Sequence, residues 1–106
     1  MNIGETIKSI RKRKGLSQKK LAELSGISQT YLSQIEKFGV RNPSLEILTK
    51  ISFALELPYP VFAFLSLDYS DIAKNKLAAY KKIEPAVDAL IKEFFLSEDK
   101  NRKKMN

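Results

Sequence analysis

The stretch LSQKKLAELSGISQTYLSQIEKFGVRNPSLEIL, residues 16–48, decides the fold of this chain. It contains two short segments with apolar residues at helical spacing, residues 17–25 and 28–37. Gly26 lies between them and can adopt the positive φ that a tight turn requires. This order of signals predicts two consecutive helices joined by a short turn.

The two segments carry the residues that a close helix crossing needs. Ser17 and Ser28 precede them as N-cap residues, and Gly39 ends the second. Ala22 provides a small side chain on the inner face of the first segment, and Leu24 extends its apolar stripe. The residues predicted to pack the crossing are Leu21, Ile27, Leu32 and Ile35. The second segment can then present its N-terminal outer face to a groove about 12 Å wide, the width of the DNA major groove.

Helical spacing continues on both sides of this pair. Upstream, isoleucines beginning at Ile3 predict a helix that Gly15 ends. Downstream, Pro60 is predicted to start a fifth helix through Leu67. Ser44 opens the intervening fourth helix, whose apolar positions are Leu45, Leu48, Ile51, Phe53, Ala54 and Leu55. Because no alternating strand pattern of useful length appears, the chain is predicted to be all-α.

The pattern changes beyond these five helices. Ser70 is the expected N-cap of a further helix that includes Leu77 and Tyr80, and Pro85 either kinks that helix or starts a new one. An amphipathic stripe follows at residues Ile83, Val87, Leu90, Ile91, Phe94 and Phe95. The remaining tail is polar and basic, and we expect it to be disordered. The predicted divisions are a first domain, a C-terminal helical segment and a tail: residues 1–67, 68–97 and 98–106.

Composition excludes several classes of function. The chain has 106 residues with no His and no Cys. It therefore has no zinc finger, no thiol nucleophile and no imidazole base, and it shows no Gly-rich phosphate loop. We expect no catalytic residue, no metal, no cofactor and no enzymatic activity. The longest apolar run, Val61 to Leu65, is far shorter than the ~20 residues that span a bilayer, and the N-terminus lacks a signal-peptide core. We therefore expect a cytoplasmic protein.

Positive charge is concentrated around the two central helices. The chain carries a net charge of +7, and residues 1–67 hold ten Lys and Arg against five Asp and Glu. Eight of these ten basic residues occur from Lys8 to Lys37. This distribution indicates a polyanionic partner, and nucleic acid fits best. A membrane-surface role would instead place the basic residues along one long amphipathic helix.

Together these residues resemble a known family. Residues 3–67 are similar to the Cro/repressor-type helix-turn-helix domain, also called the xenobiotic-response-element (XRE) family. The similarity is carried by Ile7, Ile10, Arg11, Gly15, Leu16, Ser17, Gln18, Leu21, Ala22, Ser25, Gly26, Ile27, Ser28, Tyr31, Leu32, Ile35, Glu36, Asn42, Pro43, Leu45, Leu48, Ile51 and Leu55. It departs at residues 38–41 and in the proline-rich tract 57–60. The resemblance implies a five-helix lambda-repressor-like domain with a C-terminal helical extension, in a transcriptional regulator that binds double-stranded DNA.

The resemblance assigns base contacts to the outer face of the helix after Ser28. The four positions are Gln29, Thr30, Ser33 and Gln34. Their chemistry suits the role, because glutamine can make paired hydrogen bonds to adenine and threonine can contact the thymine methyl group. The alternative is an ordinary solvated polar face.

Contacts to the DNA backbone are expected around that helix, at Gln18, Lys19, Ser28, Tyr31, Lys37, Arg41, Asn42 and Ser44. Gln18 stands at a helix N-terminus, where free N–H groups attract phosphate, although it can equally be a capping residue. Each lysine can also be a solvated charge. For Arg11 and Glu36, the resemblance instead implies a structural, partly buried ion pair.

The C-terminal stripe has a separate expected role. Residues 3–67 form a complete small core in similar domains, so the stripe is predicted to be a homodimer surface made by Val87, Leu90, Ile91, Phe94 and Phe95. One alternative is that it packs against its own domain. Another is that it holds a toxin or other protein, as in an antitoxin that also binds DNA. A homodimer would place its recognition helices in successive major grooves of a palindromic operator, about 34 Å apart, and most simply act as a repressor.

Overall fold

A computed structural model describes residues 1–38 and 43–97 of the chain. The predictions for Gly39, Arg41, Asn42 and the tail at residues 98–106 lie outside the described residues. The described part is all-helical and has no strand, as predicted. Its elements are α1 (Ile3–Arg13), α2 (Gln18–Ser25), α3 (Gln29–Phe38), α4 (Leu45–Ala54), α5 (Tyr59–Ser66), the 3₁₀ turn η1 (Tyr69–Asp71), α6 (Leu77–Ile91) and the π-helical turn η2 (Lys92–Leu96).

Local signals set the ends of these helices. Three of the four predicted N-cap serines accept a hydrogen bond from a backbone N–H, Ser17 from Lys20 at 3.0 Å, Ser28 from Tyr31 at 3.0 Å and Ser44 from Ile47 at 3.2 Å. After α1 and α2 the chain turns at Gly15 and Gly26, whose φ angles are 72° and 70°. A side chain would strain the backbone there, so these glycines suit both turns.

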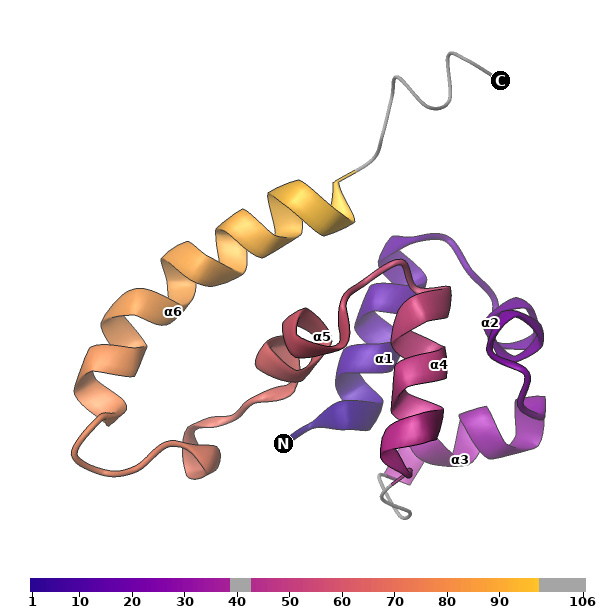
Figure 1. The fold of residues 1–106 in the computed structure, drawn as a ribbon, viewed down its shortest axis with the longest axis horizontal. Helices are drawn as coiled ribbons and strands as arrows, with labels where there is room; N and C mark the ends of the chain where they lie inside the picture. Colours follow the sequence, from indigo (N-terminus) through magenta and orange to yellow (C-terminus); the bar gives the residue numbers. More distant parts are fainter. Residues whose placement is uncertain (39–42, 98–106) are drawn as a thin grey trace.

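Five helices enclose the core (Figure 1). Helix α1 packs against α3 and α5, while α2 packs against α3 and α4. The most deeply buried apolar side chains are Ile7, Leu21, Leu32, Ile35, Ile51, Leu55 and Phe62. The contact between α1 and α3 is very close at Gly4, where an added Cβ would lie 2.2 Å from the carbonyl oxygen of Ile35. This approach fixes the position of α3 against the rest of the domain.

Two details of the five-helix prediction are wrong. Pro60 is the second residue of α5, because the helix already begins at Tyr59. Leu24, Leu45 and Phe53 follow the apolar helical pattern, yet they are 51%, 63% and 83% exposed. On each of these helices, other apolar residues already face the core. The apolar stripe in the sequence is therefore wider than the face that the structure buries.

The predicted helix start at Ser70 is also wrong. Asp68 accepts a hydrogen bond from the Ser70 backbone N–H at 2.8 Å, and Asp71 accepts one from the Asp68 N–H at 2.9 Å. These reciprocal bonds close η1 as a single turn. The Ser70 hydroxyl, followed by the Met1 amino group, lowers the pKa of Asp68 below its ordinary value. Helix α6 begins only at Leu77 and continues through Pro85 without starting anew.

Helix α6 lies beside the five-helix domain, on the opposite side of the molecule from α3 (Figure 1). Near its start, the Tyr80 ring contacts those of Phe64 and Tyr69, with centroids 6.2 and 6.1 Å apart. Beyond the far end of α6, in η2, Leu96 is buried in the core and Phe95 packs against the core. The core is therefore not confined to residues 3–67 but includes the end of the C-terminal segment.

No helix among the described residues is by itself both long and apolar enough to span a membrane. Helices α4 and α5 reach the required length and composition only when taken together, and they bend by 102° at their junction.

Candidate nucleic-acid interface

Helix α3 has one buried face and one polar outer face. Leu32 and Ile35 are 0% and 1% exposed and hold the helix against α1 and α2. This packing turns the four candidate base-contacting residues away from the core. Of these, Gln29, Thr30 and Gln34 are exposed and Ser33 is half-buried.

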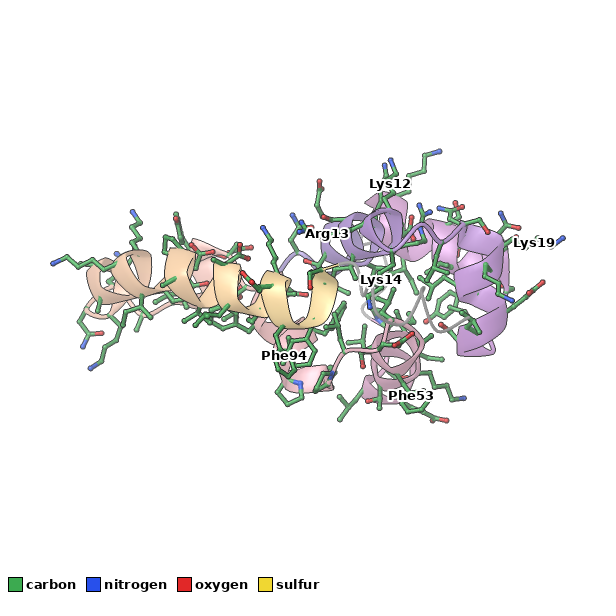
Figure 2. All side chains as sticks on the ribbon, turned by 90° about the horizontal axis from the view of Figure 1, so that it is seen from above. Lys12, Arg13, Lys14, Lys19, Phe53 and Phe94 are labelled. Atoms are coloured by element: carbon green, nitrogen blue, oxygen red, sulfur yellow. The ribbon has the colours of Figure 1, made fainter. Side chains whose placement is uncertain are left out.

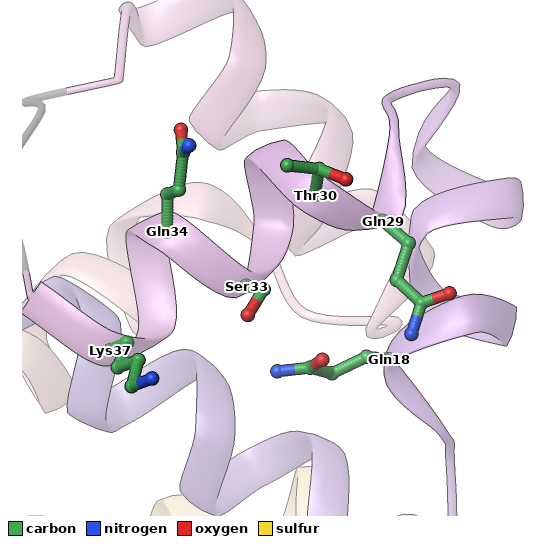
Figure 3. Close-up of a pocket in the computed structure, with 6 residues that line it drawn as sticks. All are labelled: Gln18, Gln29, Thr30, Ser33, Gln34 and Lys37. Carbon is green, nitrogen blue, oxygen red and sulfur yellow. The ribbon is translucent and has the colours of Figure 1, made fainter.

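These four side chains share a shallow hollow with Gln18 and Lys37 (Figure 3). The hollow has a volume of about 400 Å³, and no acidic side chain lines it. Its lining offers amide donors and acceptors, two hydroxyl groups and one ammonium group. Such a set can hydrogen-bond to base edges and attract phosphate.

A buried ion pair links α1 to α3, and it is the one that the resemblance implies. Arg11 Nε lies 2.8 Å from Glu36 Oε2, and Arg11 Nη2 donates to Glu36 Oε1 at 3.0 Å. The side chains are only 10% and 2% exposed. Arg11 Nη1 also donates to the carbonyl oxygen of Leu16 at 2.8 Å. These bonds tie α1, the α1–α2 turn and α3 into one rigid unit.

Gln18 is tied to the same ion pair. Its Nε2 donates to Glu36 Oε1 at 3.0 Å. Since a carboxylate can only accept, the amide nitrogen of Gln18 must face Glu36. The amide retains its oxygen and one further N–H for other partners. The sequence predicts a phosphate contact or a cap at Gln18, and no feature of the residue spacing indicates this bond to Glu36.

The other candidate backbone contacts have different surroundings. Lys19 is exposed, while Tyr31 is half-buried and packs against the core. The hydroxyls of Ser28 and Ser44 cap α3 and α4. Lys37 lines the hollow with the base-contacting candidates. These positions surround the N-terminal half and the end of α3.

The residues of the C-terminal stripe do not share one environment. Leu90 and Phe94 are 70% and 81% exposed, whereas Val87, Ile91 and Phe95 are half-buried. Phe95 packs against the chain's own core, in line with the alternative that the stripe folds back. Figure 2 shows Phe94 projecting on the opposite side of the molecule from the basic residues Lys12 and Arg13.

Comparison with known proteins places this geometry in a family. Residues 7–62, more than half of the chain, match the family described as Helix-turn-helix. The chain belongs to this XRE-type helix-turn-helix family. The matched residues run from α1 into α5 and so include both α2 and α3.

Relatives in the XRE-type family are transcriptional regulators. The HTH-type transcriptional regulator SinR of Bacillus subtilis (strain 168) is 46% identical over 55 residues, which are 52% of this chain and 50% of SinR. The HTH-type transcriptional regulator SlrR of the same organism is 49% identical over 55 residues, which are 52% of this chain and 36% of SlrR. The chain thus spans half or less of the length of these curated relatives.

A solved structure extends the likeness beyond the shared domain. The crystal structure of the clp gene regulator ClgR from Corynebacterium glutamicum has a TM-score of 0.57 and 25% sequence identity. The match covers 87% of this chain and 89% of that chain. This share is larger than the five-helix domain, so the similarity includes part of the C-terminal segment.

Proposed function

We propose that the chain is a sequence-specific DNA-binding transcriptional regulator, most simply a repressor, that reads its operator with α3. The observation that carries this proposal is the outer face of α3, where Gln29, Thr30 and Gln34 are exposed on a helix that a buried ion pair ties to α1. A preorganised helix of this kind can enter the major groove without rearranging its own core. Ser33, half-buried at the centre of the hollow, completes the reading surface.

In this proposal, affinity comes from basic side chains and selectivity from the amides of the hollow. Lys19, Lys37 and Arg41 are candidate phosphate contacts, together with the polar groups of Gln18, Ser28, Tyr31, Asn42 and Ser44. Three cations in each of two copies would neutralise six phosphates. Binding should then weaken about 10³-fold between 50 and 200 mM salt.

The test begins with selection of bound sequences from a random DNA pool. Gln29→Ala and Gln34→Ala are then compared with the parent chain on the selected operator and on scrambled DNA. Each bidentate glutamine contact is worth about 1–3 kcal/mol, so each variant should lose about 5- to 150-fold in selectivity per half-site. Asn75→Ala is the matched control, because it removes an exposed amide from the linker between η1 and α6. Selectivity that survives both glutamine changes would exclude this face as the reader.

We further propose that the regulator binds a palindromic operator as a homodimer. The support is the apolar face of α6 and η2, where Leu90 and Phe94 are more than two-thirds exposed. Large exposed apolar side chains of this kind favour association. Phe94→Ser should therefore shift the chain toward monomer in sedimentation, whereas Phe53→Ser, which changes an equally exposed phenylalanine on α4, should not.

The antitoxin alternative uses the same exposed face for a different partner protein. It predicts that the purified chain sediments as a monomer at every concentration and still binds DNA selectively. A concentration-dependent dimer that Phe94→Ser weakens would exclude that alternative in favour of the homodimer.

A further inference from the structure

Helix α6 has an apolar face that α1–α5 leave uncovered. Ile83 is 59% exposed, Leu90 is 70% exposed and Phe94 is 81% exposed, while Val87 is half-buried. These four residues recur at intervals of four, three and four, the heptad spacing of helices that pair along their length. Two exposed alanines lie on the same face. We name this face the α6 seam, and it consists of Ala79, Ile83, Ala86, Val87 and Leu90 on α6, with Phe94 in the adjoining turn η2.

We propose that the α6 seam pairs with the α6 seam of a second copy, and that the two helices run antiparallel. The inference rests on the proposed function and specifies the dimer within it. The seam is self-complementary about a point between Ala86 and Val87. Ile83 and Leu90 lie equally far from that point, so each faces the other across the pair. Ala79 and Phe94 are also equidistant in sequence, so Phe94, in the turn η2 that follows α6, lies toward the end of the other helix that carries the small Ala79.

The charges beside the seam favour the same arrangement. Lys82 and Glu93 are both exposed and flank the seam on the side of Ala86. In an antiparallel pair this flank meets its own counterpart, which brings Lys82 of one copy within about one helical turn of Glu93 of the other. In a parallel pair this flank would instead meet the opposite flank of the other copy, so Lys82 of one copy and Glu93 of the other would not face each other.

The position of α3 in the molecule gives an independent reason to expect antiparallel pairing. The two-fold axis of a parallel pair runs along the helices, whereas that of an antiparallel pair is perpendicular to them. The five-helix domain lies to one side of α6, with α3 at its far edge (Figure 1). Phe94 projects sideways from the line that joins α6 to this domain (Figure 2). The α6 seam lies on this lateral face. The two-fold axis of an antiparallel pair therefore runs along the line from α6 to the domain, and both five-helix domains lie on the same side of the two α6 helices.

This arrangement lets both α3 helices face one DNA segment, as binding to successive major grooves requires. Parallel pairing would carry the second domain to the opposite side of α6. The seam geometry and the proposed reading surface therefore require the same helix orientation.

The absence of cysteine from the chain allows a direct test by disulfide trapping. Single variants Ala86→Cys, Ile83→Cys and Leu90→Cys are oxidised under mild conditions and analysed on non-reducing gels. A disulfide needs Cα atoms within about 7 Å. In the antiparallel pair, Ala86→Cys lies beside its counterpart and should form a covalent dimer. The two copies of Leu90→Cys are about 10 Å apart along the axis and should not.

Mixing supplies the decisive comparison. Ile83→Cys and Leu90→Cys should each stay monomeric on the gel when oxidised alone, yet form a covalent heterodimer when mixed before oxidation. Self-dimers of Leu90→Cys without those of Ala86→Cys would show a parallel pair, and no covalent dimer in any sample would exclude the seam as an interface. Either result overturns the inference. DNA selectivity is measured on the same samples after reduction. Retained selectivity would show that α3 still reads DNA even where the α6 seam does not pair.

Discussion

Removing one partner of the buried ion pair beneath α3 should cost far more than removing both. Glu36 is 2% exposed and accepts hydrogen bonds from Arg11 at 2.8 and 3.0 Å. Glu36→Leu leaves the guanidinium buried without a counter-charge, which costs about 3–5 kcal/mol. Arg11→Met should cost a similar amount, slightly offset because Gln18 still donates to Glu36. A loss of 3 kcal/mol corresponds to about 12–24 °C in Tm for a domain of this size.

The double variant Arg11→Met/Glu36→Leu removes both charges. Its expected loss is only about 1–2 kcal/mol, because Gln18 and the Leu16 carbonyl oxygen each lose one hydrogen bond. The double variant should thus be more stable than either single variant.

The assay is urea unfolding at pH 7 followed by far-ultraviolet circular dichroism. Lys50→Met is the control, since it breaks the exposed Glu46–Lys50 pair, 3.5 Å long, and should cost no more than about 0.5 kcal/mol. Single-variant losses below about 1 kcal/mol, or a double-variant loss equal to their sum, would refute the argument that burial gives this pair its strength.

Three further predictions concern packing and backbone and use the same unfolding assay. Gly4→Ala should cost about 1–3 kcal/mol, because its Cβ would collide with the carbonyl oxygen of Ile35; an unchanged midpoint would mean that α1 and α3 separate freely. Gly26→Ala should cost about 1–2 kcal/mol at φ 70°, and Gly26→Asn should cost less; the reverse order would contradict the role given to backbone strain. Phe62→Ala should cost about 3–5 kcal/mol and Phe53→Ala, at an exposed site, about 0.5 kcal/mol; equal losses would refute the assigned core.

The parts of the fold that follow from the sequence are those set by local chemistry. A hydroxyl at Ser17 can bond to an N–H three residues later whatever surrounds it, and Gly26 accepts a positive φ in any context. Helical spacing also separates the buried Leu32 and Ile35 from the exposed Gln29 and the rest of the outer face. The sequence therefore predicts which residues form the polar outer face of α3.

The features that the sequence did not predict depend on competition between local hydrogen bonds or on contacts between residues far apart in the chain. Ser70 is a plausible helix cap, but Asp68 and Asp71 close a turn around it first. Helix α4 is followed by Glu56, whose φ is 60°. Glutamate is not a residue type that predicts this left-handed conformation. The close approach at Gly4 depends on a carbonyl oxygen from α3. None of these features changes the periodic spacing of apolar residues from which helices are predicted.

The end of α6 shows most clearly why one amphipathic stripe could not be assigned a single role. In a regular α-helix, Phe94 and Phe95 would lie 100° apart on one broad face. Here the last residues form the π-helical turn η2, and Leu96 enters the core while Phe94 remains 81% exposed. One end of α6 is therefore anchored to the domain by its own side chains, and the neighbouring seam stays free for another helix. Under the proposed function, the docking of Leu96 fixes the angle between α6 and α3, and this angle sets the distance between the two reading helices of a dimer.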